Sequence, residues 1–162
     1  MPTIATHVWR PSGARRVVLD GFAPVPRGTI PAPPAPLVWP SKDPNDVLDY
    51  EFEIAAGLLG NRGDGIATLD VTITPAGNAG DLVLNSSSAD GAIAVFWFSA
   101  GNAGTNYVVQ VSVGTTSGRT LSRAVILPVL SLSTASAPID ILTSDTGAII
   151  TDQDGNPIAI GG

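Results

Sequence analysis

Apolar and polar residues alternate in the stretch that follows a polar turn at Asp43-Pro44-Asn45. A period of two is the pattern of a β-strand with one face on a core and the other in water. The turn supports a strand start, because proline sets φ and short polar side chains bond to their own backbone. We therefore expect a β domain to begin here, with an apolar face on the core and a carboxylate face in solvent. The apolar positions are Leu48, Tyr50, Phe52 and Ile54, and the facing set is Val47, Asp49, Glu51 and Glu53.

Further short segments rich in alternating or β-branched residues follow, separated by turns that contain glycine and asparagine. The segment 86–91 is polar. The last two segments flank Thr115-Thr116-Ser117-Gly118 and form the strongest predicted hairpin. This series predicts an all-β fold, an immunoglobulin-like β-sandwich over residues 42–130. Its expected strands after the first lie at 66–74, 81–85, 92–99, 106–114 and 119–129, with a possible helical turn at 55–59.

Aromatic residues on two predicted strands carry specific expectations. Tyr107 opens a long strand after a glycine turn. Sandwich folds often place there a tyrosine whose hydroxyl bonds across a corner, although an ordinary strand aromatic fits the pattern equally well. In Val95-Phe96-Trp97-Phe98 we expect Val95 and Trp97 to face the core. Phe96 and Phe98 would then contact another chain, because exposed aromatic residues on one face need a second surface.

Residues 1–41 differ in charge from the rest of the chain. They carry a net charge of +3, whereas residues 42–162 carry −9. A basic arm can dock on an acidic surface, either that of its own domain or that of a sibling subunit. Within residues 1–20 two short strands are predicted, which pack on their own domain or add to the sheet edge of a neighbouring subunit. The candidate assembly contacts in this part are Trp9, Arg10, Arg15 and Arg16.

A proline-rich segment, residues 21–41, joins this basic part to the predicted sandwich. Seven prolines exclude helix and central strand over most of it and favour extended polyproline backbone. Such a segment is a spacer or, less often, a ligand for a proline-binding groove. Trp39 near its end is expected to cap the core of the sandwich.

The C-terminal part, residues 131–162, consists of a small-residue linker and an eight-residue repeat. Each repeat has an apolar pair, a threonine, a polar turn and a glycine, and a third short apolar segment follows. This pattern predicts a thin β-ladder that cannot bury its own apolar side. Ile141, Ile149 and Ile158 are therefore candidate contacts with an oligomer or with a neighbouring protein.

Catalytic and ligand-binding patterns are weak. The chain has one histidine, His7, and no cysteine, so a catalytic triad and thiolate metal sites are disfavoured. The segment Asp152 to Asn156 has its glycine too early for a calcium loop. Arg62-Gly63-Asp64 is interpreted as a coincidence in a loop. We expect no catalytic, cofactor-binding or metal-binding residues, and hence no enzyme.

Two classes of partner are also disfavoured. Four arginines without a basic helix or interleaved aromatic residues are too few for a nucleic-acid interface. No apolar run approaches the roughly 20 residues of a membrane helix, and the N-terminal residues do not have the pattern of a secretory signal. The expected partners are therefore other proteins, including copies of the same chain.

Residues 40–130 resemble a known family. The strings Lys42 to Glu53, Ala94 to Tyr107 and Thr115 to Thr120 are similar to those of the fiber-tail adaptor-like proteins of tailed bacteriophages. Ile54 stands where a tryptophan is expected in that family. The resemblance implies a non-catalytic virion protein, made in the host cytoplasm, whose immunoglobulin-like domain links the tail or its fibers to the particle.

Other functions are also compatible with the sequence. A capsid decoration or head-fiber protein would differ from a tail adaptor only in its position in the particle. A carbohydrate-binding adhesin module would need exposed aromatic residues in a shallow groove, which Trp9, Trp39 or Phe96 could supply.

Overall fold

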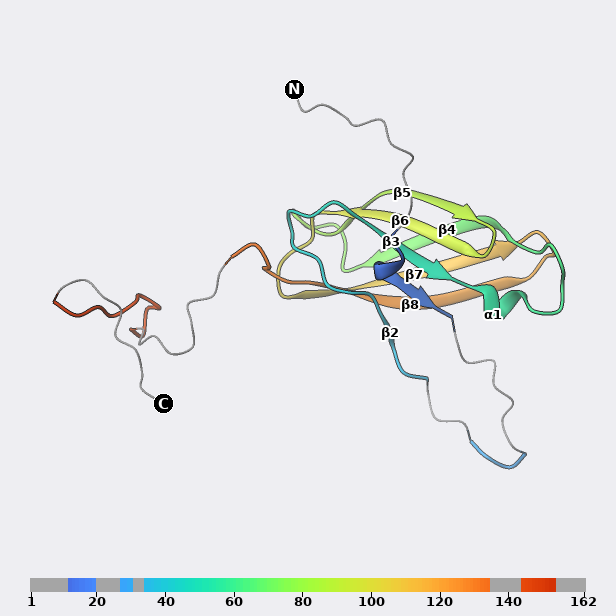
Figure 1. Ribbon diagram of the computed structural model, residues 1–162, viewed down its shortest axis with the longest axis horizontal. Coiled ribbons are helices and arrows are strands. Elements are labelled where there is room, and N and C mark those ends of the chain that lie inside the picture. The colour runs from blue at the N-terminus through green and yellow to red at the C-terminus, as the bar shows by residue number, and fades with distance from the viewer. Residues whose placement is uncertain (1–11, 20–26, 31–33, 135–143, 154–162) are drawn as a thin grey trace, which may run out of the picture. The chain divides into compact units, whose positions relative to one another are not determined.

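The structure, a computed structural model, describes residues 12–19, 27–30, 34–134 and 144–153. The chain divides into two units, Met1–Ser131 and Leu132–Gly162. The first unit contains two short helical turns and eight strands among its described residues (Figure 1). These elements are η1 (Gly13–Arg15), β1 (Arg16–Val18), β2 (Leu37–Val38), β3 (Leu48–Glu53), α1 (Ala55–Leu58), β4 (Ile66–Thr74), β5 (Val83–Asp90), β6 (Ile93–Ser99), β7 (Thr105–Thr115) and β8 (Thr120–Val129).

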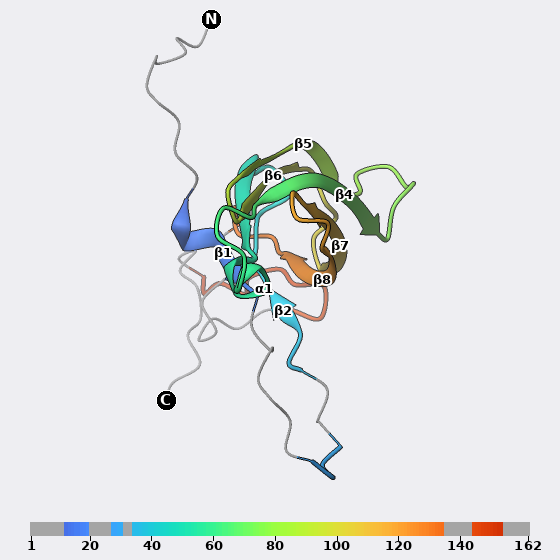
Figure 2. The same ribbon diagram turned by 90° about the vertical axis from the view of Figure 1, so that its right-hand side faces the viewer.

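The strands form two four-stranded sheets that lie face to face (Figure 2). One sheet has the order β1-β3-β6-β5 and the other β2-β8-β7-β4. The expected all-β sandwich is therefore confirmed. We interpret the topology as immunoglobulin-like, because β3 to β8 follow the order of strands B to G in that fold, B-E-D in one sheet and C-F-G in the other.

The alternation of apolar and polar residues along the strands determines which side chains form the core. On β3 the apolar side chains Tyr50 and Phe52 are fully buried, and on β7 every second residue from Tyr107 to Val113 is buried. β7 and β8 pair over their whole length as the predicted hairpin. The strand expected at 81–85 extends further in the structure, because β5 continues through Asp90 in pairing with β6. Its polar side chains are exposed as those of an edge strand, so no apolar pattern marks it.

Aromatic side chains fill the centre of the sandwich. The Trp39 ring packs edge-on against Tyr50 at 5.6 Å and Phe96 at 6.0 Å between ring centroids, and Phe96 stacks on Phe98 at 6.1 Å. Phe96 and Phe98 are both 0% exposed, so the prediction that they contact another chain is wrong. The reason is register: Tyr50 pairs with Phe96, and the apolar face of β3 thereby fixes which face of β6 is inside. The expectation that Trp39 closes the core is confirmed.

The same register shows that Val95 and Trp97 do not face the aromatic core, contrary to the expectation from the sequence. Val95 lies opposite Glu51 on the far side of the sheet from the aromatic cluster, where it is nevertheless buried. Trp97 lies on that side too and is partly exposed. The alternation along β6 was therefore right, but the choice of inner face was reversed.

Tyr107 forms a tyrosine corner at the start of β7. Its hydroxyl oxygen accepts a hydrogen bond from the backbone N–H of Asn102 at 2.9 Å, and the hydroxyl donates to Oδ1 of Asp81 at 3.1 Å. The other carboxylate oxygen of Asp81 accepts from the backbone N–H of Asn78 at 2.8 Å. These bonds, first the one from Asn78, hold the pKa of Asp81 below its usual value. The prediction that the Tyr107 hydroxyl bonds across a corner is thus confirmed. Its two hydrogen bonds fasten the loops that contain Asn102 and Asp81 to the sandwich.

Phenylalanine substitutions at the two buried tyrosines should have different effects. Tyr107→Phe removes the bond from the Asn102 N–H and the bond to the Asp81 carboxylate, and should lower the free energy of unfolding by about 2 kcal/mol, at about 1 kcal/mol net for each buried hydrogen bond. The Tyr50 hydroxyl is buried without a hydrogen-bond partner among the described residues, and burial raises its pKa to about 12. Tyr50→Phe should therefore leave stability unchanged or raise it by up to about 1 kcal/mol. Urea denaturation measures both, and equal losses would contradict the assignment.

Lys42, at the start of the segment that resembles the adaptor family, is a structural residue. Its backbone joins the end of β8, and its fully buried ammonium group donates to the carbonyl oxygens of Asp43 at 2.7 Å and Ala100 at 2.5 Å. Burial lowers its pKa from the usual value. The Asp43 carboxylate accepts from the backbone N–H of Asn45 at 2.9 Å, as expected for the predicted turn. This string therefore closes one end of the sandwich.

In the second unit the structure describes one tight turn. The backbone N–H of Ser144 donates to the carbonyl of Ala148 at 2.8 Å, and Gly147 adopts φ of 80° in the turn. This is the polar turn predicted for the first repeat. The rest of the predicted ladder lies outside the described residues, apart from the first part of the second repeat.

Candidate assembly interface

The residues Ser12–Leu19, called here the arm segment, lie on the open edge of β3. β1 pairs with β3 in parallel, with Arg16 opposite Glu51 and Val18 opposite Glu53. The backbone N–H of Leu19 extends the pairing by donating to the Glu53 carbonyl at 2.8 Å. Part of the basic N-terminal region thus forms the first strand of a sheet, and the expectation that it docks on an acidic surface is confirmed for the arm segment on its own domain.

Two consecutive arginines of the arm segment bind the carboxylates of β3. The Arg15 guanidinium pairs with the Asp49 carboxylate and also donates to the Asp49 carbonyl at 2.5 Å. Arg16 donates to Glu51 at 2.5 Å from Nε and to Glu53 at 3.1 Å from Nη1. Three acids at alternate positions on one strand face are therefore matched by two neighbouring cations, and charge-assisted bonds of this kind are the stronger ones.

Two of the three matched carboxylates are buried. Asp49 is 5% exposed and Glu51 is 1% exposed, so the expectation of a solvated carboxylate face is wrong. Burial alone would raise the pKa of Asp49, but hydrogen bonds from the Ser12 backbone N–H and the Arg15 guanidinium outweigh it and lower that pKa. The bond to Glu51 raises the pKa of Arg16. The interface is therefore an ionic contact with little access to water.

An acid titration should weaken this contact. The pKa of Asp49 is lower in the folded than in the unfolded state, so its stabilisation is complete above the unfolded value, about 3.9, and is lost as pH falls through the folded value. The difference in unfolding free energy between the wild type and Asp49→Asn should therefore shrink as pH falls below about 4. Urea denaturation at several pH values measures it, and a difference that stays constant down to pH 2 would contradict the argument.

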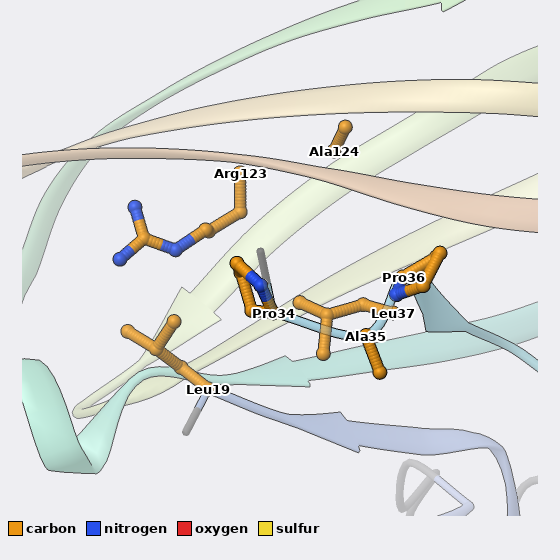
Figure 3. Close-up of a pocket in the computed structure, with 7 residues that line it drawn as sticks. All are labelled: Leu19, Pro34, Ala35, Pro36, Leu37, Arg123 and Ala124. Carbon is orange, nitrogen blue, oxygen red and sulfur yellow. The ribbon is translucent and has the colours of Figure 1, made fainter. Parts of the chain in front are cut away.

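Apolar contacts accompany the ion pairs. Val17 and Leu19 of the arm segment are buried as part of the core. Beyond Leu19 a pocket of about 290 Å³ opens between the arm segment, the residues before β2 and the edge of β8 (Figure 3). It is lined mainly by apolar side chains, with the Arg123 side chain on one wall: Leu19, Pro34, Ala35, Pro36, Leu37, Arg123 and Ala124. The arm segment and the residues before β2 thus meet on the same side of the sandwich.

The structure brings together two of the nine predicted contact residues, Arg15 and Arg16. Ile149 is 47% exposed, in the second unit, and its role as a contact stays a prediction. Phe96 and Phe98 belong to the core and are excluded as contacts, as described above. The remaining predicted contacts lie outside the described residues: Trp9, Arg10, Ile141 and Ile158.

The alternation of polar and apolar residues on β3 did not indicate that Asp49 and Glu51 bind the arm segment; these two residues are called its seat below. A signal was present, because the only pair of adjacent arginines, Arg15-Arg16, and the densest run of acids at alternate positions, Asp49, Glu51 and Glu53, carry complementary charge. The pattern of a strand with one polar face does not distinguish a face in water from a face covered by arginines.

The loop containing Arg62-Gly63-Asp64 uses its acid internally. The Asp64 side chain is fully buried, and one of its oxygens accepts from the Thr116 hydroxyl at 2.9 Å and the Ser117 backbone N–H at 3.0 Å. Burial would raise the pKa of Asp64, but these bonds lower it. Its carboxylate therefore fastens one loop to the β7–β8 turn, which agrees with the interpretation of this tripeptide as a coincidence.

The described residues contain no group of three or more histidine, cysteine or acidic residues placed to hold a metal ion. In the same parts of the chain, no helix has the length and apolar character needed to span a membrane.

Fold and interface together define a structural β-sandwich module, in which the buried polar groups hold an arm segment and connecting loops. A protein-family model described as podophage GP4 fiber-tail adaptor protein gp77 matches residues 42–128, slightly more than half of the chain. The chain therefore belongs to this family of structural phage proteins, and the resemblance seen in the sequence is confirmed. No curated protein matches the chain.

Proposed function

We propose that this protein is a non-catalytic virion component that joins the tail or its fibers to the phage particle. In this proposal residues 42–130 are a rigid spacer, and residues 1–41 and 131–162 engage other virion proteins and further copies of the same chain. The protein is made in the host cytoplasm and incorporated during assembly.

The family match over residues 42–128 carries the proposal, because the matched family is described as a fiber-tail adaptor. The geometry supports it in two ways. The matched part forms a sandwich with a packed aromatic core, which suits a spacer. The arm segment lies outside the matched residues and binds by ion pairs and strand addition, a common mode of peptide recognition.

The structure disfavours one of the two alternative functions, the adhesin, and is compatible with the other, the capsid decoration or head-fiber protein. A capsid decoration or head-fiber protein would use the same sandwich and ends, and is distinguished only by position in the particle. An adhesin is disfavoured, because Trp39 and Phe96, two of the three aromatic residues considered for a sugar groove, are buried in the core.

The experiment that tests the proposal is removal of the protein from the phage. Particles lacking it should contain filled capsids but no attached fibers in negative-stain electron microscopy, and supplying the full chain should restore fibers. Cross-linking of restored particles should place residues from both ends of the chain on other proteins or copies. Particles that retain fibers but lose a capsid surface feature would instead assign the protein to the head. A glycan array with the full chain tests the adhesin alternative.

A further inference from the structure

We propose that assembled copies of this protein exchange arm segments, so that Ser12–Leu19 of one copy docks on β3 of a neighbouring copy. The partner is thus a second copy of the chain, and the contacts are those seen within one chain. This inference rests on the proposed function in one respect, namely that several copies assemble side by side.

The contacts that hold the arm segment do not depend on which copy supplies it. Its polar contacts with the sandwich, as far as the chain is described, all go to β3: from Ser12 and Arg15 to Asp49, from Arg16 to Glu51 and Glu53, and from the Leu19 N–H to the Glu53 carbonyl. A neighbouring copy can offer the same donors to the same acceptors. Exchange of an identical element between copies is a route to oligomers that needs no new interface.

Each copy requires an arm segment on its β3 edge. Without one, the β3 backbone would be an unpaired sheet edge, which natural proteins cover because it recruits other strands. The carboxylates of Asp49, Glu51 and Glu53 would repel one another without the two arginines, and core contacts of Val17 and Leu19 would be lost. The edge must be filled, but it need not be filled by the same chain.

The connection to the sandwich is long enough to reach a neighbour. Fourteen residues separate Leu19 from Pro34, and four of them are proline. At the polyproline rise of about 3.1 Å per residue, such a segment can span roughly 40 Å. A domain of about 100 residues has a radius of gyration near 13 Å, so this span exceeds the distance between adjacent copies in contact.

The connection does not determine which copy the arm segment joins. It also closes within one copy, because Leu19 and Pro34 line the same pocket. In dilute solution the arm segment still docks on its own β3, because that site is always present. In an assembly the neighbouring β3 is held at an effective concentration in the millimolar range, and the two sites compete.

Cysteine pairing tests which copy supplies the arm segment. The chain has no cysteine, and Val18 and Glu53 are register partners whose side chains are 50% and 26% exposed. One tagged chain carries Val18→Cys and a second, differently tagged, carries Glu53→Cys. The two are co-expressed, and both the purified assembly and particles assembled with them are oxidised mildly. We expect a disulfide-linked heterodimer that reduction dissolves. The matched control pairs Val18→Cys with Ser122→Cys, an exposed position on the other sheet, and should give no heterodimer.

Two outcomes overturn the inference, and they can be told apart. Assembled copies that give no heterodimer, while a chain carrying both Val18→Cys and Glu53→Cys closes its disulfide internally, would show that every arm segment docks on its own copy. The adaptor function would then stand without exchange. Chains that stay monomeric in sedimentation at all concentrations and never enter particles would overturn the exchange and the proposed function together.

A second pair of variants makes the result independent of cysteine chemistry. Arg15→Glu/Arg16→Glu reverses the charge of the arm segment, and Asp49→Lys/Glu51→Lys reverses that of its seat. Each variant alone should lose protection of the Leu19 amide from hydrogen exchange. Co-expression of the two variants should restore protection of the Leu19 amide in the second variant. Its unchanged basic arm segment can dock on the unchanged Asp49 and Glu51 of the first variant. No recovery on co-expression would contradict exchange.

Discussion

Replacing Trp39 by alanine should lower the free energy of unfolding of the sandwich by about 3–5 kcal/mol, the range for deleting a buried aromatic side chain. Trp39 is 1% exposed and contacts Tyr50 and Phe96 edge-on. Its indole N–H donates to the Glu51 carbonyl at 2.8 Å, so the substitution also leaves a buried acceptor without its donor. Urea denaturation followed by fluorescence and circular dichroism measures the change.

The neighbouring residue supplies the control. Val38 is the last residue of β2 and directly precedes Trp39; it is 49% exposed, so Val38→Ala should change stability by no more than about 0.5 kcal/mol. A loss from Trp39→Ala as small as that from Val38→Ala would mean that Trp39 is not part of the folded core. The comparison is informative because Trp39 precedes the residues that match the adaptor family.

Most strands could be predicted because one set of alternate side chains is apolar and the other polar. β3 and β4 show this pattern clearly, and the apolar face expected to lie on the core was identified correctly for β3. β6 has large apolar residues on both faces, in Val95-Phe96-Trp97-Phe98, so alternation predicts the strand without identifying the inner face. Pairing with β3 decides that face, and the pairing is a property of the fold.

The contact between the arm segment and β3 could be predicted only in part. The charge imbalance of the chain indicated that the basic region docks on an acidic surface. The partner of Arg15 is 34 residues away, beyond a proline-rich segment, and no local pattern specifies which carboxylates it meets. The loop at the tyrosine corner was more accessible to prediction, because a tyrosine that follows a glycine turn at the start of a long strand is a local signal.

Removing both guanidinium groups of the arm segment, in Arg15→Ala/Arg16→Ala, should cost on the order of 2–4 kcal/mol. Leaving one member of a buried ion pair without its partner costs about 3–5 kcal/mol. The side chains of Arg15 and Arg16 are 23% and 34% exposed, and solvent screening reduces each contribution. Asp49 and Glu51, which are buried, must then be rehydrated, and this requires the arm segment to leave β3. Urea denaturation should show the loss, and the Leu19 amide should exchange rapidly with solvent.

Two control variants separate the contributions to this effect. Arg62→Ala removes an arginine from an exposed loop position and should be neutral within about 0.5 kcal/mol. Arg15→Lys/Arg16→Lys keeps the charge but loses the planar fork that lets each arginine bind at more than one acceptor, so it should recover only part of the stability. If the alanine variant kept both its stability and its protected Leu19 amide, Val17 and Leu19 alone would hold the arm segment. Docking would then depend on apolar burial, and neither charge reversal nor acid should release the arm segment.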